Sequence, residues 1–212
     1  MKLDCPITVL GRNTSSNVQK VMWLLAEVGC GCERLDVGGK HGGNREESYL
    51  KKNPNGVVPT VLHGENVIWE SNTILRYLAN TLGLSAMYPI DPAERAGVER
   101  WMDWQLSTFG PANVLLYQSI VRTPVAERNE GVIEQHRTRN ATLLAVLEGV
   151  LARQPFIAGP EMTLADISIG PLVHRWFNLP VSRPDYPHLK TWYHSMCERQ
   201  PFFDNVVKIE FS

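Results

Sequence analysis

An apolar, mostly β-branched run interrupted by a proline constrains this chain more than any other feature. The run spans 57–62, and Pro59 stands inside it. Because proline cannot donate a hydrogen bond to a neighbouring strand, it belongs at a sheet edge or a bulge. The peptide bond before a proline can also be cis, at a cost of only about 0.5–1 kcal/mol. The main chain of Val58 can therefore turn away from the sheet unpaired, where a short extended peptide could add as an extra strand.

A predicted helix start follows shortly after this run. Glu70 and Ser71 close a strand predicted over 66–69 and open a helix. The first amide groups of a helix have no partner within it and attract anions. A strand edge for main-chain pairing and a helix start for a carboxylate together indicate a site for a small acidic peptide.

The first 83 residues alternate between strand and helix patterns. The predicted order is a strand over 7–10, an amphipathic helix from the polar cluster 12–17 to Gly29, a weak strand over 33–37, a short polar helix over 45–52, a hairpin over 57–69 and a helix from Ser71 to Gly83. This order is a βαβ unit followed by an antiparallel hairpin. It predicts an α/β domain of the thioredoxin-like type, with Pro59 in the place of that fold's cis-proline.

The rest of the chain reads as wholly helical after a segment, 84–92, that has two prolines and no periodicity. The long predicted helices cover 98–109, with a bend near Gly110, and 128–151. Thr163 and Asp166 have the spacing of a capping box, and the helix that follows is apolar nearly all round, so we expect it to be central. The predicted division is a thioredoxin-like domain over 1–83, a linker over 84–92 and an all-α helical domain over 93–212.

Composition excludes several classes of function. A formal net charge of −1 argues against a nucleic-acid surface, which usually needs a basic face. The longest uninterrupted apolar run, Val21–Ala26, is too short to cross a bilayer, and the first residues lack the apolar segment of a signal peptide. We therefore expect a cytoplasmic protein. The four cysteines (Cys5, Cys30, Cys32 and Cys197) fit neither a zinc site nor a disulfide framework, and nothing resembles a metal site.

Three motifs, in their order and separations, closely resemble those of the cytosolic glutathione transferases of the bacterial serine-type, theta- or nu-like kind. They are Asn53–Thr60, Glu70–Ile74 leading to Tyr77 and Leu78, and Thr163–Ile167. The resemblance covers essentially the whole chain. It implies the glutathione transferase fold and a homodimer. It also implies a detoxification enzyme that takes glutathione as co-substrate, stabilises its thiolate and conjugates it to a small hydrophobic electrophile.

The segment 14–17, between the first strand and the first helix, offers what such a thiol needs. A free thiol titrates near 8.5; lowering that pKa by two units takes roughly 2.7 kcal/mol. A donating hydroxyl supplies roughly 1.5–3 kcal/mol and a helix start about 0.3–1 kcal/mol. By alignment to the serine-type pattern, Ser15 falls at the thiol-activating position, with Thr14 and Ser16 as alternatives. Asn17 falls where nu-like relatives keep an asparagine near the sulfur. The alternative interpretation is that the segment only caps the helix.

The resemblance also assigns the remaining contacts. Val58 suits the cysteinyl main chain, Ser71 the γ-glutamyl carboxylate and Glu70 the ammonium group. The residues assigned to glutathione are Lys40, His41, Val58, Pro59, Glu70 and Ser71, with Lys40 and His41 meeting the glycine carboxylate or remaining solvated. The residues assigned to the electrophile, by spacing on the first long helix of the helical half, are Trp104, Phe109, Asn113 and Tyr117. Aromatic side chains on a helix more often belong to the core.

Two rival functions and the sub-class stay open at this point. The same thiolate could reduce disulfides or peroxides or dehalogenate haloacids. A transferase-fold module could instead bind ligands or partner proteins without catalysis. Asn72 stands where some serine-type relatives carry arginine, and Gly56-Val57 where some carry histidine. Arg12 has no assigned role beyond a solvated or salt-bridging one.

Overall fold

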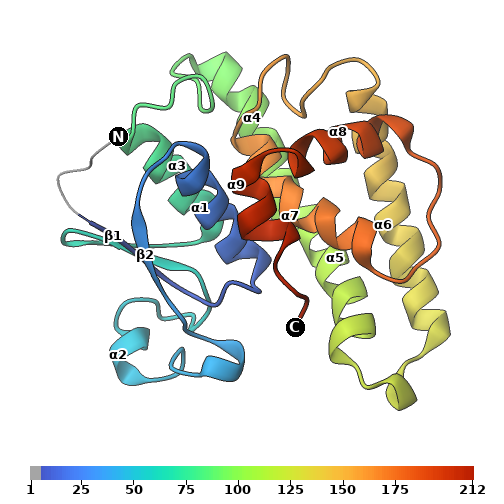
Figure 1. Ribbon diagram of the computed structural model, residues 1–212, viewed down its shortest axis with the longest axis horizontal. Helices are drawn as coiled ribbons and strands as arrows, with labels where there is room; N and C mark the ends of the chain where they lie inside the picture. The colour runs from blue at the N-terminus through green and yellow to red at the C-terminus, as the bar shows by residue number, and fades with distance from the viewer. Residues whose placement is uncertain (1–5) are drawn as a thin grey trace. The chain divides into compact units, whose positions relative to one another are not determined.

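The computed structural model describes residues 6–212, so Cys5 lies outside the described residues. The chain forms two compact units (Figure 1). The first comprises the residues up to Ser85 together with Gln200–Glu210. The second comprises Ala86–Arg199 with Phe211 and Ser212.

A four-stranded sheet forms the centre of the first unit. Its strands are β1 (Ile7–Leu10), β2 (Cys32–Leu35), β3 (Thr60–His63) and β4 (Asn66–Trp69), in the order β2-β1-β3-β4. β1 runs parallel to β2 and antiparallel to β3, and β3 pairs antiparallel with β4. The predicted βαβ unit with an appended hairpin is thereby confirmed. The run over 57–62 becomes a strand only from Thr60, because Pro59 cannot donate to the ladder.

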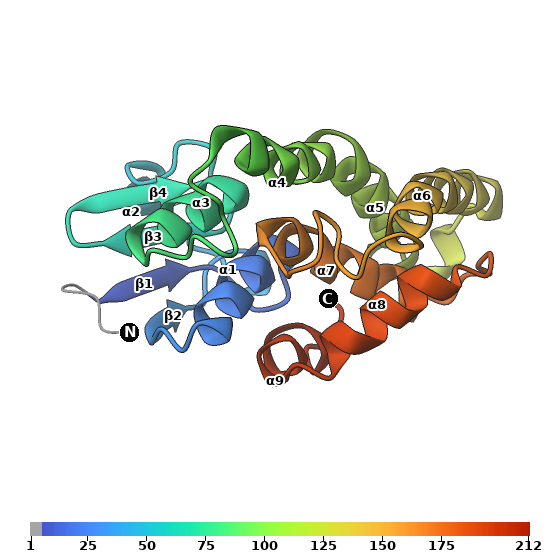
Figure 2. The ribbon, with the colours of Figure 1, turned by 90° about the horizontal axis from the view of Figure 1, so that it is seen from above.

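Two helices of the first unit, α1 (Ser16–Glu27) and α3 (Ser71–Thr81), pack side by side (Figure 2). Both bury most of their apolar side chains, α3 packs against β4, and the two helices pack against each other. The segments η1 (Gly39–His41) and α2 (Glu47–Leu50) are short and polar. Two late segments, α9 (Gln200–Phe202) and η5 (Phe203–Val207), return to pack against α1.

The second unit is helical throughout. Its elements are α4 (Pro92–Trp104), the π-helical η2 (Gln105–Phe109), α5 (Gly110–Tyr117), the π-helical η3 (Gln118–Arg122), the 3-10 turn η4 (Val125–Glu127), α6 (Glu130–Leu151), α7 (Leu164–Asn178) and α8 (Pro187–Cys197). The predicted first long helix therefore contains a wide π turn immediately before Gly110 and Pro111. Among the described residues, no helix has the length and apolar content that a membrane span requires.

Helix α7 is the central helix of this unit, as its all-round apolar pattern predicts. The predicted capping box is present at its start. The Asp166 carboxylate accepts hydrogen bonds from the Thr163 amide at 2.9 Å and from the Ile157 amide at 3.0 Å. It also accepts from Thr163 Oγ1 at 3.3 Å and from Trp192 Nε1 at 2.9 Å. Asp166 therefore joins its helix to two other segments of the unit, at Ile157 and in α8, in addition to capping it.

Candidate functional site

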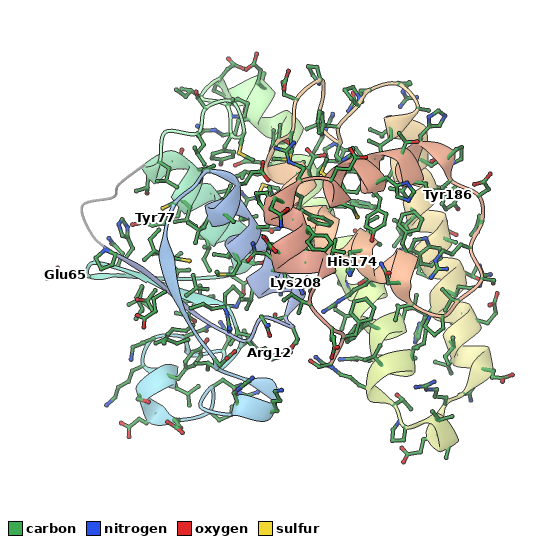
Figure 3. The ribbon with its side chains drawn as sticks, in the orientation of Figure 1. Arg12, Glu65, Tyr77, His174, Tyr186 and Lys208 are labelled. Atoms are coloured by element: carbon green, nitrogen blue, oxygen red, sulfur yellow. The ribbon has the colours of Figure 1, made fainter. Side chains whose placement is uncertain are left out.

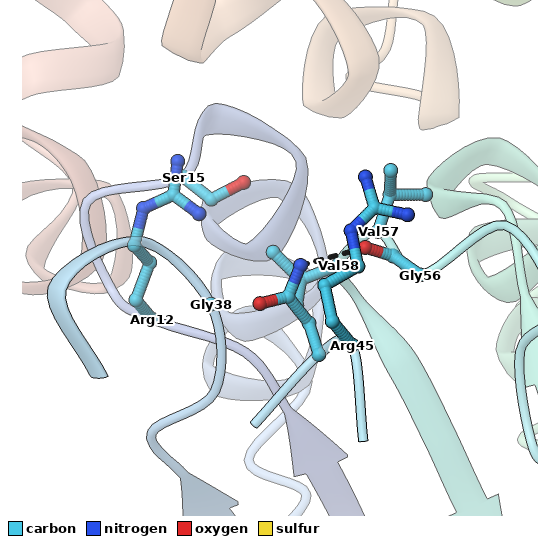
Figure 4. Close-up of a pocket in the computed structure, with 8 residues that line it drawn as sticks. Arg12, Ser15, Gly38, Arg45, Gly56, Val57 and Val58 are labelled. Carbon is cyan, nitrogen blue, oxygen red and sulfur yellow. Dashed lines mark hydrogen bonds between the residues drawn. The ribbon is translucent and has the colours of Figure 1, made fainter. Parts of the chain in front are cut away.

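The first unit contains a cavity of about 220 Å³ at the ends of its strands (Figure 4). It is lined by Arg12, Ser15, Gly38, Asn44, Arg45, Gly56, Val57 and Val58. Two of the predicted site residues, Ser15 and Val58, thus share one cavity although they are distant in sequence.

Ser15 lies at the start of α1, in an extended backbone conformation with φ −81°. Its carbonyl accepts a hydrogen bond from the Gln19 amide at 2.9 Å, so it begins the helix. Its hydroxyl makes no capping hydrogen bond, which counts against a purely capping role for this side chain. Ser15 is 8% exposed and lines the cavity, and it immediately precedes the first helical turn of α1. A thiolate there would meet a hydroxyl donor and a helix start together.

The main chain at Val58 provides the predicted edge. The Val58–Pro59 peptide bond is cis. The preceding carbonyl, of Val57, accepts hydrogen bonds from the Tyr49 hydroxyl at 2.6 Å and from Asn53 Nδ2 at 2.9 Å. Within residues 6–212, by contrast, the amide and carbonyl of Val58 itself make no hydrogen bond to the chain. The neighbouring backbone is therefore held in place while Val58 keeps a donor and an acceptor for an extended peptide.

The turn before Val58 depends on a glycine. Gly56 has φ +61°, and a Cβ there would lie 2.8 Å from Arg45 Nη1 and 2.9 Å from the Asn44 carbonyl oxygen. Asn44 Nδ2 donates to the Gly56 carbonyl at 2.7 Å, the hydrogen bond that is dashed in Figure 4. This contact joins the loop after η1 to the turn before Val58 and closes one wall of the cavity.

The cavity is positively charged. Arg12 lies on its Ser15 side and Arg45 on its Val57 side (Figure 4), and no acidic side chain belongs to the lining. Arg12 packs on the glycine-rich loop, because a Cβ on Gly39 would lie only 2.8 Å from Arg12 Cδ. Two guanidinium groups around one cavity favour a ligand that carries negative charge.

Sequence reasoning left Arg12 unexplained and missed Asn44 and Arg45 altogether. The usable signal was Gly56, because a required positive φ there indicates that another segment approaches the turn closely. No pattern in the sequence identified which segment that would be.

A second group of predicted residues meets at the start of α3. Ser71 is 4% exposed, and its hydroxyl donates to Asn17 Oδ1 at 3.2 Å. Ser71 Oγ in turn accepts a hydrogen bond from Lys20 Nζ at 3.4 Å. Asn17 and Lys20 are three residues apart on α1 and so share a face of that helix. Asn17 was predicted near the sulfur; the structure places its amide against Ser71. Sequence reasoning missed Lys20, because its spacing from Asn17 shows that they share a helix face but not that α3 packs there.

Glu70 precedes this helix start with φ +68°, a conformation that is uncommon and strained for a residue other than glycine. Its side chain is exposed and makes no capping bond to α3. The backbone thus holds a free carboxylate next to the anion-attracting start of a helix. A ligand with an ammonium group beside a carboxylate, as in an amino acid, would find both partners at Glu70 and Ser71.

Lys40 and His41 do not line the cavity. Both are exposed on η1, and His41 Nε2 lies 3.7 Å from Asp36 Oδ1. The hydrogen bond from Arg34 is the main reason that the pKa of Asp36 is lowered, so this carboxylate stays ionised near His41. Of the cationic groups in this part of the chain, the cavity wall holds Arg12 and Arg45.

The four residues assigned to the electrophile all lie in the second unit. The rings of Trp104 and Phe109 stack with their centroids 5.5 Å apart. Asn113 Nδ2 donates to the Leu172 carbonyl at 3.1 Å, and the Tyr117 hydroxyl donates to the Ser212 carbonyl at 2.9 Å. Phe109, Asn113 and Tyr117 are at most 2% exposed, whereas Trp104 is partly exposed. In this conformation only Trp104 of the four has surface for direct contact with a ligand.

Comparison with known proteins identifies the family. Residues 5–80 match the model of the glutathione S-transferase N-terminal domain, and residues 98–200 match that of the C-terminal domain. Glutathione S-transferase GstB of Escherichia coli (strain K12) is 36% identical over 208 residues, which cover 97% of this chain and 100% of that protein. Glutathione S-transferase 3 of Zea mays is 31% identical over 96% of this chain and 95% of its own length.

The structural comparison gives the same answer. The theta class glutathione S-transferase from the citrus canker pathogen Xanthomonas axonopodis pv. citri, solved with glutathione bound, superposes with a TM-score of 0.94 at 42% identity. The match covers 98% of this chain and 100% of that one. The resemblance that the three sequence motifs carry is thereby confirmed. The chain belongs to the glutathione S-transferase family and is an enzyme of that class.

Proposed function

We propose that this chain binds glutathione with its sulfur at Ser15, stabilises the thiolate and conjugates it to a small hydrophobic electrophile. The observation that carries the proposal is the cavity in which the Ser15 hydroxyl and the unpaired main chain of Val58 face the same space. The Val58 edge suits the cysteinyl part of the tripeptide, which would place the thiol near the start of α1.

The γ-glutamyl end has partners at the start of α3. Ser71 offers its hydroxyl and amide to the carboxylate, and the exposed Glu70 offers its carboxylate to the ammonium group. Asn17 accepts the hydrogen bond from the Ser71 hydroxyl and lies on the same helical turn as Ser15. It therefore lies between the two ends of the site.

The glycine carboxylate has two sets of candidate partners. Lys40 and His41 are those that the family resemblance implies. The cavity wall instead favours Arg45, whose Nη1 is held by the Asn55 carbonyl at 3.4 Å. We therefore expect Arg45→Gln to weaken glutathione binding more than Lys40→Gln or His41→Gln. A larger loss of glutathione affinity in Lys40→Gln or His41→Gln would show that η1 binds the glycine carboxylate instead.

The reaction assigned to this site needs no residue to carry a covalent intermediate. The thiol proton leaves to solvent, because a hydroxyl donor and the helix start favour the charged sulfur. The thiolate then bonds the electrophilic carbon, whose leaving group departs with its electron pair. Holding the nucleophile next to its target supplies much of the remaining acceleration.

Calorimetric titration with glutathione, followed by a pH series that reads thiolate absorbance in the complex, tests the proposal. We expect binding of one tripeptide per chain and a bound thiol whose pKa lies about two units below the free value near 8.5. Binding without that shift would point to a non-catalytic module, and absence of binding would refute the proposal. Turnover of aromatic halides, disulfides, peroxides and haloacids would then identify the reaction.

The remaining expectations are a homodimer and a cytoplasmic location. Edge strand β4 exposes Val67 and Trp69, 43% and 37% accessible, which is apolar surface that a second copy could cover. Light scattering across a dilution series tests the assembly. Cell fractionation tests the location, which suits an enzyme that needs reduced glutathione.

A further inference from the structure

We propose that Lys20 is a positioning residue for the γ-glutamyl carboxylate of glutathione and acts through Ser71. The inference rests on the proposed function, because it concerns how the same site holds its ligand. Lys20 is fully buried, although lysine is among the residue types least often buried. Its ammonium group donates to Ser71 Oγ at 3.4 Å.

The bond to Lys20 constrains the Ser71 hydroxyl. A serine hydroxyl has one proton to donate and two lone pairs that accept. With the ammonium group on one lone pair, the proton must point away from Lys20, and in this structure it points to Asn17 Oδ1 at 3.2 Å. A bound carboxylate on that side can take the proton in place of Asn17. Lys20 thus holds Ser71 Oγ in place, while the proton of the Ser71 hydroxyl changes its acceptor from Asn17 to the bound carboxylate.

The charge of Lys20 adds to this effect. A hydroxyl that accepts from a cation is polarised and becomes a stronger donor in turn. The start of α3 already carries partial positive charge, and its first turn has no acidic side chain. The ammonium group of Lys20, 3.4 Å from Ser71 Oγ, adds positive charge next to this helix start, and positive charge favours an anionic ligand. Lys20 makes other interactions as well, and the proposal needs only its bond to Ser71.

Calorimetry with two ligands separates this role from a general structural one. The first ligand is glutathione, and the second is 4-aminobutanoyl-cysteinyl-glycine, which keeps the ammonium group but lacks the γ-glutamyl carboxylate. We expect Lys20→Met to weaken glutathione binding about tenfold, within the range of one charge-assisted hydrogen bond. Its affinity for the analogue should stay within about twofold of the parent, since the lost contact serves only the carboxylate. Lys20→Arg, which retains the charge, should recover part of the glutathione affinity.

The control is Lys52→Met, in the same unit, because Lys52 Nζ donates to the Ser48 carbonyl at 2.8 Å away from the site. It should leave both affinities unchanged. In a Ser71→Ala background, Lys20→Met should cost much less than alone, because the two residues act as one contact.

Three outcomes would overturn the proposal. Lys20→Met could weaken the binding of both ligands equally, it could weaken neither, or its effect could be fully additive with that of Ser71→Ala. If Lys20→Met fails to fold, Lys20→Arg replaces it in the test. This variant must then lose more affinity for glutathione than for the analogue. Failure of the parent chain to bind glutathione would be a separate result, which refutes the proposed function itself.

Discussion

The Ser71 hydroxyl donates to Asn17 Oδ1 at 3.2 Å, and this bond joins the first residue of α3 to the first turn of α1. Ser15, which begins α1, lies two residues before Asn17. The packing of α1 against α3 thus keeps the carboxylate-binding end and the thiol-activating end proposed for the site next to each other, also when a ligand takes the Ser71 proton. Because their spacing is fixed, a tripeptide of matching length would be oriented by its two ends.

Removing the Ser71 hydroxyl should weaken binding more than turnover. We expect Ser71→Ala to raise the dissociation constant for glutathione about tenfold, as loss of one hydrogen bond to a charged group does. The turnover number at saturating glutathione should change less, because the contact is present before and during the reaction. Calorimetry and initial rates measure both quantities. Thr73→Ala, an exposed position on the same helix, is the control, and an unchanged affinity in Ser71→Ala would remove Ser71 from the site.

Gly56 and Gly83 provide a matched pair for the cavity wall. Both have positive φ, +61° and +67°, so alanine at either position costs about 1–2 kcal/mol of backbone strain. At Gly83 nothing lies within 4 Å of the added Cβ, whereas at Gly56 the Asn44 carbonyl lies 2.9 Å away. We expect Gly56→Ala to lower the free energy of unfolding further than Gly83→Ala and to weaken glutathione binding as well. Urea denaturation and calorimetry measure the two quantities. If Gly56→Ala and Gly83→Ala lost the same stability and bound glutathione equally well, the cavity wall would tolerate a displacement of Asn44.

Asp166 should matter far more than an ordinary helix cap. Its carboxylate accepts from four donors and is completely buried, so Asp166→Ala leaves several buried donors without a partner. Each such donor costs about 1–3 kcal/mol, and we expect a total of at least ~3 kcal/mol. The control is Asp91→Ala, at the exposed cap of α4, which should cost only about 0.5–2 kcal/mol. Denaturant unfolding measures the loss of stability in each variant. A similar loss in Asp166→Ala and Asp91→Ala would contradict this account.

Stability should depend on pH through His174, which is labelled in Figure 3. Burial is the main reason that the pKa of His174 falls from 6.5 to about 4. As pH falls through this window the unfolded chain takes up a proton that the folded chain refuses, so the folded state loses stability. The loss should approach about 3 kcal/mol and should be absent above the unfolded pKa.

The measurement is the free energy of unfolding from pH 7 toward ~4.5, taken as the difference between the parent and His174→Gln. His174→Gln should be less stable at neutral pH, because it loses the contact of Nδ1 with the Tyr193 hydroxyl at 2.9 Å, but it should depend less on pH. His188→Gln, at an exposed histidine, should keep the slope of the parent. An unchanged slope in His174→Gln would assign the pH dependence to other groups.

Local patterns predicted most of the fold. The strand at Ile7–Leu10, the helix from Ser71 and the capping box at Thr163 follow from periodicity and capping chemistry, which act within a few residues. The start of β3 was predicted three residues early. The apolar run there continues through Pro59, but the missing amide keeps the ladder from extending past Thr60.

The candidate site was predictable only where a motif marks it. Ser15 was assigned by alignment to the serine-type pattern and Val58 from the proline pattern, and the structure brings both to one cavity. Arg45 and Lys20 were missed because their places depend on which segments pack together, and no local pattern encodes that. Three of the four residues assigned to the electrophile are buried, since spacing on a helix does not distinguish a lining residue from a core residue.

The pKa of glutathione's thiol when bound, read from thiolate absorbance in the parent chain and in Ser15→Ala, tests the central claim most directly. The account predicts that Ser15→Ala still binds glutathione, raises the bound thiol pKa by about one unit or more and cuts turnover roughly ten- to a hundredfold. Ser16→Ala, on the same turn, should match the parent in both respects. A Ser15→Ala variant with the thiol pKa and turnover of the parent would contradict the account.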